Sequence, residues 1–346
     1  MAASRSRLDR LTKPPGSLGR LEALATLLAG ITGDEVPRVD RPTIIVFAAD
    51  HGVARRGVSA YPSEVTAQMV ANFVAGGAAI NVLARVVDAK LVAVDVGLAG
   101  PVREPARRAP HGGARLVTAR IAAGTRDLTV EAAMTAAQCA AALEVGRSVL
   151  ADELAAGTNL VVVGEMGIGN TTAASALVAA LTEVPPDEVT GRGTGLDEPA
   201  LERKVRTIEA AIERHRPDPA APLEVLAQLG GLEIAALVGA ILCCVESRVP
   251  VILDGFITGA AALVAAAIAP GAESRMIASH RSPEPGHRLA LERLGLDPLL
   301  DLQLRLGEAS GAALALPIVQ AAGAIVAEMA TFEGAGVSGR SGGPAG

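Results

Sequence analysis

The sequence has very few aromatic residues. It contains no Trp, one Tyr and four Phe in 346 residues, which leaves little side-chain surface for stacking the bases of a nucleic acid. Its formal charge is -6 at pH 7, whereas proteins that follow a phosphate backbone are usually basic. We therefore expect neither a nucleic-acid polymer nor an anionic membrane surface as a partner.

Cysteines and long apolar runs are also scarce. Cys139 and the adjacent Cys243 and Cys244 form no CxxC motif and no even disulfide framework, which favours a reducing compartment. The first twenty residues lack the apolar core of a signal peptide, and the apolar run at 251–269 is interrupted by Asp254. These features predict a cytoplasmic protein without a membrane span.

Short β-branched runs alternate with alanine-rich segments of helical length. The runs predict strands at residues 43–48, 90–96, 160–163 and 249–253, and the segments predict helices at 63–74, 130–151, 172–181 and 231–244. Strands that alternate with long helices indicate an α/β fold with a parallel sheet and helices on both faces.

The two ends of the chain differ from this middle part, because they carry helical patterns without β-branched runs. We expect a small helical domain from residues 1–30 and 295–335, and a large α/β catalytic domain from residues 31–294. The glycine-rich residues 336–346 are expected to be a disordered tail.

Three of the predicted strands end in polar turns: FAADHG, GEMGIGNTT and DGFITG. Ligands of open parallel sheets bind beyond the carboxyl ends of the strands. The three turns are therefore expected to converge on one site.

The second turn has the features of a phosphate site. Gly167 and Gly169 permit close backbone approach, and the amides of Asn170, Thr171 and Thr172 open a helix whose dipole favours an anion. The spacing fits neither the dinucleotide fingerprint nor a triphosphate loop with its lysine. The motif alone is equally compatible with a mononucleotide phosphate held without a lysine and with an ordinary glycine turn. The later turn TGRGTGLD, with more glycine amides and Arg192, favours the phosphate.

Other polar residues allow two interpretations each. His51, at a strand end beside Asp50, suits a positioning role better than metal binding, because HxH and HExxH motifs are absent; no metal site is predicted. Met69 is compatible with plain core packing or with the wall of an aromatic pocket. Glu308 is compatible with a first-turn acid favoured by the helix dipole or with a general base whose pKa is raised by apolar surroundings.

Eight segments, taken in order from about Leu8 to Met329, resemble the nicotinate-nucleotide:dimethylbenzimidazole phosphoribosyltransferase family. They are LTKPPGSLGRLE, AADHGV, VSAYPSEVTAQMVANFVAGGAAIN, GEMGIGNTT, TGRGTGLD, DGFITGAAAL, SHRSPEPGH and LGEASGAALALPIVQAA. The resemblance implies a Rossmann-like sheet, a small helical domain built from both termini, and a homodimer. It also implies transfer of phosphoribose from nicotinate mononucleotide to 5,6-dimethylbenzimidazole for the lower ligand of cobalamin, without a cofactor.

The resemblance also implies roles for individual residues. It makes Glu308 the catalytic base and Glu165 a second active-site acid; Ala309 stands where many members have glycine. The expected phosphate and nucleotide contacts are Gly167, Gly169, Asn170, Thr171, Thr172, Gly193, Thr194, Gly195, Lys204 and Asp254, and the expected benzimidazole contacts are Ser63, Gln68, Met69 and Ser59.

Two other classes of function are compatible with such a sheet. A nicotinamide-dependent oxidoreductase would need the dinucleotide fingerprint, which the sequence lacks. A sensor of nucleotides or benzimidazoles would bind the same ligands without turnover.

Overall fold

The computed structural model describes residues 1–103 and 112–338. The chain divides into two compact units, Arg41–Leu316 and the combination of Met1–Asp40 with Pro317–Gly346. These bounds differ from the expected ones, because residues 31–40 group with the terminal unit and residues 295–316 with the α/β unit. Backbone bonds from Leu299 to Ala278 (3.1 Å) and from Leu300 to Ser279 (2.9 Å) tie the latter segment to the end of a strand.

The larger unit is built on a six-stranded sheet in the order β3-β2-β1-β4-β5-β6, with every neighbouring pair parallel. The strands are β1 (Pro42–Ala49), β2 (Lys90–Gly97), β3 (Arg115–Thr118), β4 (Leu160–Met166), β5 (Val251–Leu253) and β6 (Met276–Ala278). The predicted α/β fold with a parallel sheet is confirmed. The two edge strands β3 and β6 were not predicted, because they have only four and three residues.

Helices of the larger unit connect these strands. They are η1 (Gly52–Arg56), α3 (Glu64–Ala75), α4 (Ala79–Val86), α5 (Ala136–Ala155), α6 (Asn170–Thr182), α7 (Pro186–Val189), α8 (Glu198–His215), α9 (Pro222–Leu229), α10 (Leu232–Ser247), α11 (Phe256–Ile268), η2 (Ala272–Arg275), α12 (Pro285–Leu294) and the start of α13 (Ser310–Glu328). The helix predicted at 130–151 begins later than expected, because the Thr135 hydroxyl caps it by accepting from the Gln138 amide.

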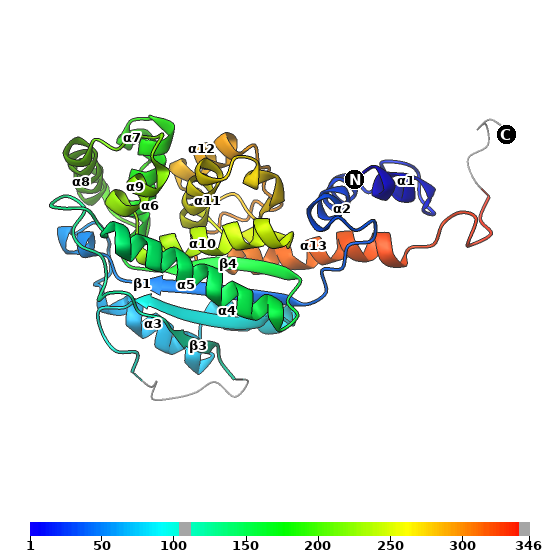
Figure 1. The fold of residues 1–346 in the computed structure, drawn as a ribbon, viewed down its shortest axis with the longest axis horizontal. Helices are drawn as coiled ribbons and strands as arrows, with labels where there is room; N and C mark the ends of the chain where they lie inside the picture. The colour runs from blue at the N-terminus through cyan, green and yellow to red at the C-terminus, as the bar shows by residue number, and fades with distance from the viewer. Residues whose placement is uncertain (104–111, 339–346) are drawn as a thin grey trace. The chain divides into compact units, whose positions relative to one another are not determined.

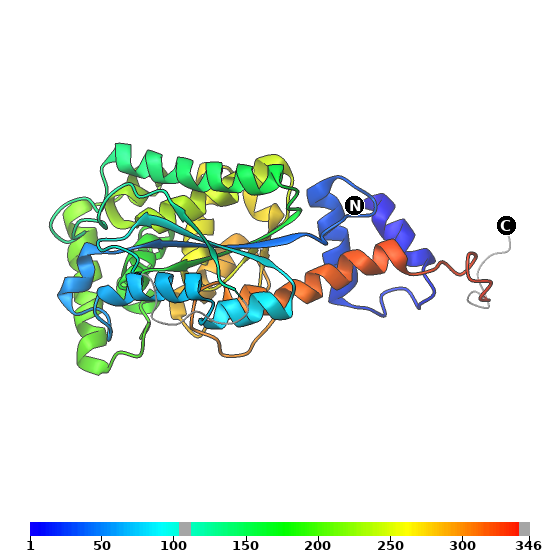
Figure 2. The same ribbon diagram turned by 90° about the horizontal axis from the view of Figure 1, so that it is seen from below.

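Helices cover both faces of the sheet. Figure 1 and Figure 2 show α5 and α10 on one face and α3 and α4 on the other. The chain moves outward from β1 to β2 and β3 in one direction, and from β4 to β5 and β6 in the other. Such a reversal point between β1 and β4 is where open α/β sheets bind ligands.

The terminal unit joins the two ends of the chain within Met1–Asp40 and the described part of 317–346. It contains α1 (Ala2–Arg10), α2 (Arg20–Thr32) and the end of α13. The Thr12 amide donates to the Ala330 carbonyl (2.9 Å) and the Phe332 amide to the Arg10 carbonyl (3.0 Å). Of the predicted tail, residues 336–338 are described and include a bond from the Val337 amide to the Phe332 carbonyl; residues 339–346 lie outside the described part.

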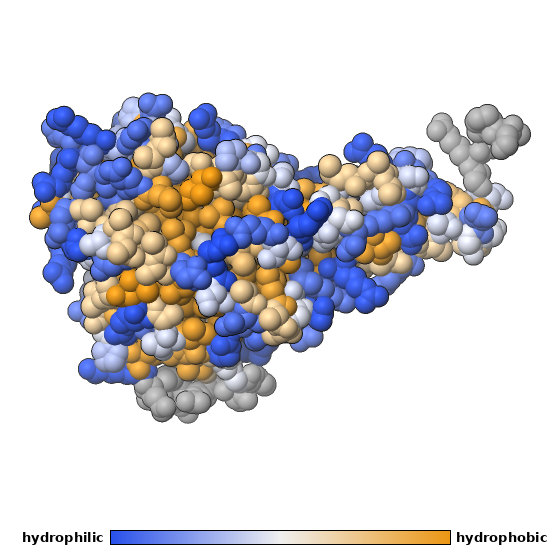
Figure 3. Space-filling view, viewed as in Figure 1, coloured by the Kyte–Doolittle hydropathy of each residue, from blue (hydrophilic) through white to orange (hydrophobic). Residues whose placement is uncertain are grey.

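Within residues 1–103 and 112–338, two helical stretches are long and apolar enough to cross a membrane, Glu64–Val86 and Ser310–Glu328. About half of each apolar window, 50% and 56%, is buried inside the protein. Figure 3 shows hydrophilic residues interspersed with apolar ones on the face drawn.

Close packing of α5 against α10 depends on glycine. A Cβ added at Gly146 would lie 2.7 Å from the Ala236 carbonyl carbon and 2.9 Å from the Ala240 nitrogen, both backbone atoms. Gly146→Ala is therefore expected to destabilise the protein by about 1–3 kcal/mol, although alanine is the better helix former. Thermal unfolding measures this, with Ser148→Ala, exposed on the same helix, as the control; an unchanged Gly146→Ala melting temperature would contradict the packing.

Candidate active site

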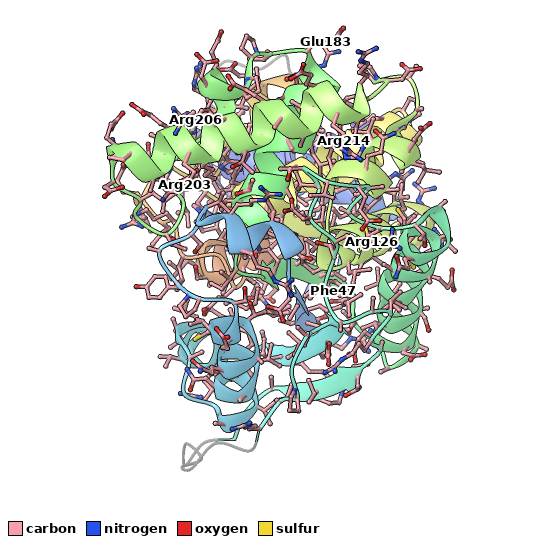
Figure 4. The ribbon with its side chains drawn as sticks, turned by 90° about the vertical axis from the view of Figure 1, so that its left-hand side faces the viewer. Phe47, Arg126, Glu183, Arg203, Arg206 and Arg214 are labelled. Atoms are coloured by element: carbon pink, nitrogen blue, oxygen red, sulfur yellow. The ribbon has the colours of Figure 1, made fainter. Side chains whose placement is uncertain are left out.

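The polar turns after β1, β4 and β5 lie side by side, because these three strands are neighbours in the sheet. They bring Asp50 and His51, Glu165, and Asp254 to the same edge, and all four side chains are buried. Figure 4 views this side of the molecule, with Phe47 of β1 near the centre and α8 with Arg203 and Arg206 across the top. The predicted convergence of the three turns is confirmed.

Glu308 reaches this edge on a strained backbone. Gly307, Glu308 and Ala309 all have left-handed φ angles, of 82°, 62° and 68°. Two consecutive non-glycine residues in the left-handed region of the φ/ψ map are uncommon, and each typically lowers the folding stability by about 1–3 kcal/mol. The Glu308 amide donates to the Glu165 carbonyl (3.2 Å), so the loop is attached directly to β4.

Asp254 caps helix α13. Its Oδ1 accepts from the Gly311 and Ala312 amides (2.8 and 3.0 Å), and its Oδ2 accepts from the Ala309 amide (3.2 Å). The helix N-terminus is thereby satisfied by a residue from the end of β5. The interpretation of Glu308 as the dipole-favoured acid of this helix is therefore wrong; Asp254 has that role, and its predicted contact with the nucleotide stays a prediction.

The carboxylate of Glu308 is 4% exposed, and its Oε2 has no hydrogen-bond partner. Burial, assisted by the negative charge of Asp254, raises the pKa of Glu308 to about 7. A carboxyl group with this pKa is suited to accept a proton near neutral pH.

Glu165, which stands on β4, lies beside Glu308 and is also buried. Asn170 Nδ2 donates to Glu165 Oε2, so the first residue of α6 orients this carboxyl group. Burial raises the pKa of Glu165 well above its ordinary value, and Glu233, Asp254 and Glu308 add to the effect.

The glycine turn leads into α6 as predicted, but its surroundings include a lysine. Gly169, with φ of 97°, precedes the helix; the Asn170 and Thr172 amides bond within the turn to the carbonyls of Gly167 and Gly169. Lys204 Nζ, from α8, donates to Thr171 Oγ1 (2.9 Å). The motif alone predicted a phosphate site without a lysine, whereas the family resemblance predicted Lys204. The structure places Lys204 beside the turn, and its contact with a phosphate stays a prediction.

Lys204 is held in a buried polar cluster. It is 0% exposed and also donates to the Gly191 carbonyl (3.0 Å). Burial lowers its pKa to about 8, opposed by the nearby Glu284 carboxylate, so the lysine is mostly cationic at pH 7.

The turn TGRGTGLD lies next to Lys204, but its glycine amides are already bonded. The Gly193 amide donates to Glu284 Oε1 (2.8 Å) and the Gly195 amide to the Arg192 carbonyl (2.9 Å). Arg192 pairs with Glu198. In this structure the turn therefore offers an anion neither of these two amides.

The expected benzimidazole residues fall into two groups. Ser59 Oγ lies 3.2 Å from Thr194 Oγ1, which places it beside the turn TGRGTGLD. Ser63 and Gln68 line a cavity of about 830 Å³ between η1, α3 and the loops after β2 and β3. Met69 does not line this cavity, and neither do Glu165 and Glu308, so the cavity adjoins the carboxylate cluster without containing it.

Two glutamates of this region escaped prediction. Glu233, in the first turn of α10, pairs with His51 (2.6 Å), and Glu284, in the motif SHRSPEPGH, bonds to Gly193. The only signal for Glu233 in the sequence was an acid after GG at a helix start. Within residues 1–103 and 112–338, no three His, Cys, Asp or Glu side chains are grouped so as to hold a metal ion.

Comparisons with known proteins identify the family of the chain. A family model described as "Phosphoribosyltransferase" matches residues 1–337. A nicotinate-nucleotide–dimethylbenzimidazole phosphoribosyltransferase from Chloroflexus aurantiacus is 55% identical over 336 residues, which cover 97% of this chain and 93% of that protein. The chain belongs to this family. A relative of the same name from Salinispora tropica is 53% identical over 98% of this chain and 95% of its own length.

Solved structures agree as well. The crystal structure of CobT from Thermus thermophilus matches with a TM-score of 0.90 and 47% identity, over 97% of this chain and 98% of that one. The fold of the family is therefore present over nearly the whole length of the chain.

The position of Glu308 depends on a glycine in the strand beneath it. A Cβ added at Gly164 would lie 2.6 Å from Ala309 Cβ and 2.7 Å from Ala309 Cα. Gly164→Ala is expected to displace residues 307–309 and to lower kcat by at least about tenfold, because an error of 1 Å at a catalytic group costs that much or more. Assays of the purified variant measure the effect.

A second substitution, Ala309→Gly, tests whether contact with Ala309 causes the loss of kcat. It removes the closest methyl contact and suits the left-handed backbone, so the double variant is expected to recover part of the lost kcat. Equal losses in the single and double variants would contradict a contribution of the Ala309 methyl group to the loss.

Proposed function

We propose that the protein transfers the phosphoribosyl group of nicotinate mononucleotide to 5,6-dimethylbenzimidazole, giving α-ribazole 5′-phosphate and nicotinate for the lower ligand of cobalamin. The observation that carries the proposal is the buried Glu308 carboxylate with an unpartnered Oε2 and a pKa of about 7, set beside Glu165. Membership of the family supports the choice of both substrates.

Glu308 acts as the general base. It removes the N–H proton of the benzimidazole while the other ring nitrogen attacks the anomeric carbon of the ribose. Because the base is already desolvated, it loses little hydration when the acceptor binds.

Glu165 stabilises positive charge that grows on the ribose. The leaving nicotinate departs from a pyridinium, so it needs no proton, and bond breaking leaves an oxocarbenium-like sugar. A carboxylate oriented by Asn170 before the reaction opposes this charge without having to reorganise. Attack from the face opposite to nicotinate inverts the anomeric centre.

The phosphate binds at the start of α6. Thr171 and the cation of Lys204 lie together there, and the helix dipole adds a favourable field. Ser63 and Gln68 contact the benzimidazole where the cavity adjoins the carboxylate cluster, and Gly193, Thr194 and Gly195 surround the phosphate once Glu284 releases the Gly193 amide. The enzyme is a cytoplasmic homodimer that requires no cofactor.

Glu308→Gln is expected to lower turnover at least about a hundredfold, since positioned bases contribute that much, and to leave nicotinate mononucleotide binding within about threefold. Formation of α-ribazole phosphate, followed by chromatography, measures the first quantity, and calorimetry the second. Glu209→Gln, an exposed glutamate on α8, is the matched control. Unchanged turnover in Glu308→Gln would refute its role as the base.

The pH dependence follows from the same residue. A base with a pKa of about 7 is protonated and inactive at lower pH, so kcat/KM is expected to fall about tenfold per pH unit below that value and to level off above it. A kcat/KM that is constant from pH 5 to 8 would contradict the assignment of Glu308 as the base.

A further inference from the structure

A buried pair of residues, His51 and Glu233, lies directly behind the glycine turn. His51 Nε2 is 2.6 Å from Glu233 Oε1, and both side chains are fully buried. His51 follows β1 and Glu233 stands in the first turn of α10, so the pair joins two elements that are far apart in sequence. Its distance suits a charge-assisted hydrogen bond in which Nε2–H donates to the carboxylate.

The pair touches the turn at Gly167. A Cβ added there would lie 3.2 Å from Glu233 Oε1 and 3.3 Å from Asn170 Nδ2, and one at Gly231, before α10, would lie 2.7 Å from Glu233 Oε2. The backbone of Gly167 therefore lies between the His51–Glu233 pair and Asn170. Asn170 in turn bonds to Glu165.

The charge of Glu233 acts on Glu165. After burial, Glu233 is the largest cause of the raised pKa of Glu165, ahead of Asp254 and Glu308. By contrast, burial and Asp254 are the causes that raise the pKa of Glu308. The two catalytic carboxyl groups therefore differ in their sensitivity to the pair.

We propose that His51 and Glu233 are positioning residues that hold the glycine turn and determine how readily Glu165 carries its negative charge toward the ribose. His51 orients the Glu233 carboxylate through the hydrogen bond between them, and Glu233 acts on Glu165. The inference rests on the proposed role of Glu165 in the transfer reaction.

Several other charged or polar groups face the same region. Asp50, at the end of β1, faces His51; Asp254 and Glu308 face Glu165 from the end of β5 and the loop before α13; Asn170 faces it from α6. All of these except Glu308 keep their native side chains in the variants below, and Glu308 is replaced equally in every variant, so differences between variants report the pair alone.

The test measures the affinity for nicotinate mononucleotide as a function of pH in the Glu308→Gln background, where turnover does not interfere. Affinity weakens when Glu165 is protonated, so the shift of the midpoint between variants, which all keep Asp254 and Lys204, reports this residue. Glu233→Gln removes a charge but keeps an acceptor for His51; it is expected to move the midpoint to lower pH by about one unit, so that Kd tightens about tenfold on the acidic limb.

His51→Gln is expected to move the midpoint in the opposite direction, because loss of the hydrogen bond from His51 leaves the negative charge of Glu233 uncompensated. The double variant His51→Gln with Glu233→Gln is expected to match Glu233→Gln alone, because His51 acts only through Glu233. Glu246→Gln, at the exposed far end of the same α10 helix, is the control and leaves the midpoint in place.

A folded Glu233→Gln protein with an unchanged midpoint would overturn the inference, as would shifts of the same sign in both single variants. If His51→Gln does not fold, the Glu233→Gln profile decides alone. Failure of the proposed function is seen separately, as absence of α-ribazole phosphate with the unmodified protein.

Discussion

The hydrogen bonds from three backbone amides to Asp254 determine the geometry of the site. They fix the start of α13 at the end of β5, and Glu308 stands directly before that helix. The left-handed backbone of Gly307, Glu308 and Ala309 persists because the Glu165 carbonyl holds one side of the loop and Asp254 the other. Without the cap, the strain at these residues would relax, and the Glu308 carboxylate would lose its place beside Glu165.

Concentrating carboxyl groups in this way has a cost in stability. The pKa values of Glu308 and Asp254 are raised to about 7, and that of Glu165 is raised well above its ordinary value. A carboxyl group whose folded pKa exceeds its unfolded value favours the folded state at pH below the unfolded pKa, and this contribution is lost as the pH rises through the folded pKa. The folded protein therefore loses stability as the pH rises through about 7, where Glu308 and Asp254 ionise.

Sequence patterns predicted the parts of the molecule that depend on local chemistry. β-branched runs gave four of the six strands, and the polar turns after β1, β4 and β5 marked the functional edge, because side-chain pattern and strand ends are readable along the chain. The short edge strands β3 and β6 were missed, since three or four residues carry too little pattern. Family resemblance, not periodicity, supplied the substrates and the assigned roles.

Contacts between segments far apart in the sequence could not be predicted from local sequence patterns. Lys204 meets Thr171, Glu284 meets Gly193 and Glu233 meets His51 across 33, 91 and 182 residues. Ala309 could be identified as a glycine replacement, but its left-handed backbone appears only in the structure. The choice between Glu308 and Asp254 as the partner of the α13 dipole likewise required the positions of the amides.

The central claim is a single displacement at the ribose, with Glu308 as the base and Glu165 opposing the charge. The most direct test is the anomeric configuration of the product that the unmodified protein forms from nicotinate mononucleotide and 5,6-dimethylbenzimidazole, determined by NMR spectroscopy. The account predicts the α-linked ribazole phosphate from the β-linked donor. A β-linked product, or nicotinate release without any ribazole phosphate, would contradict it.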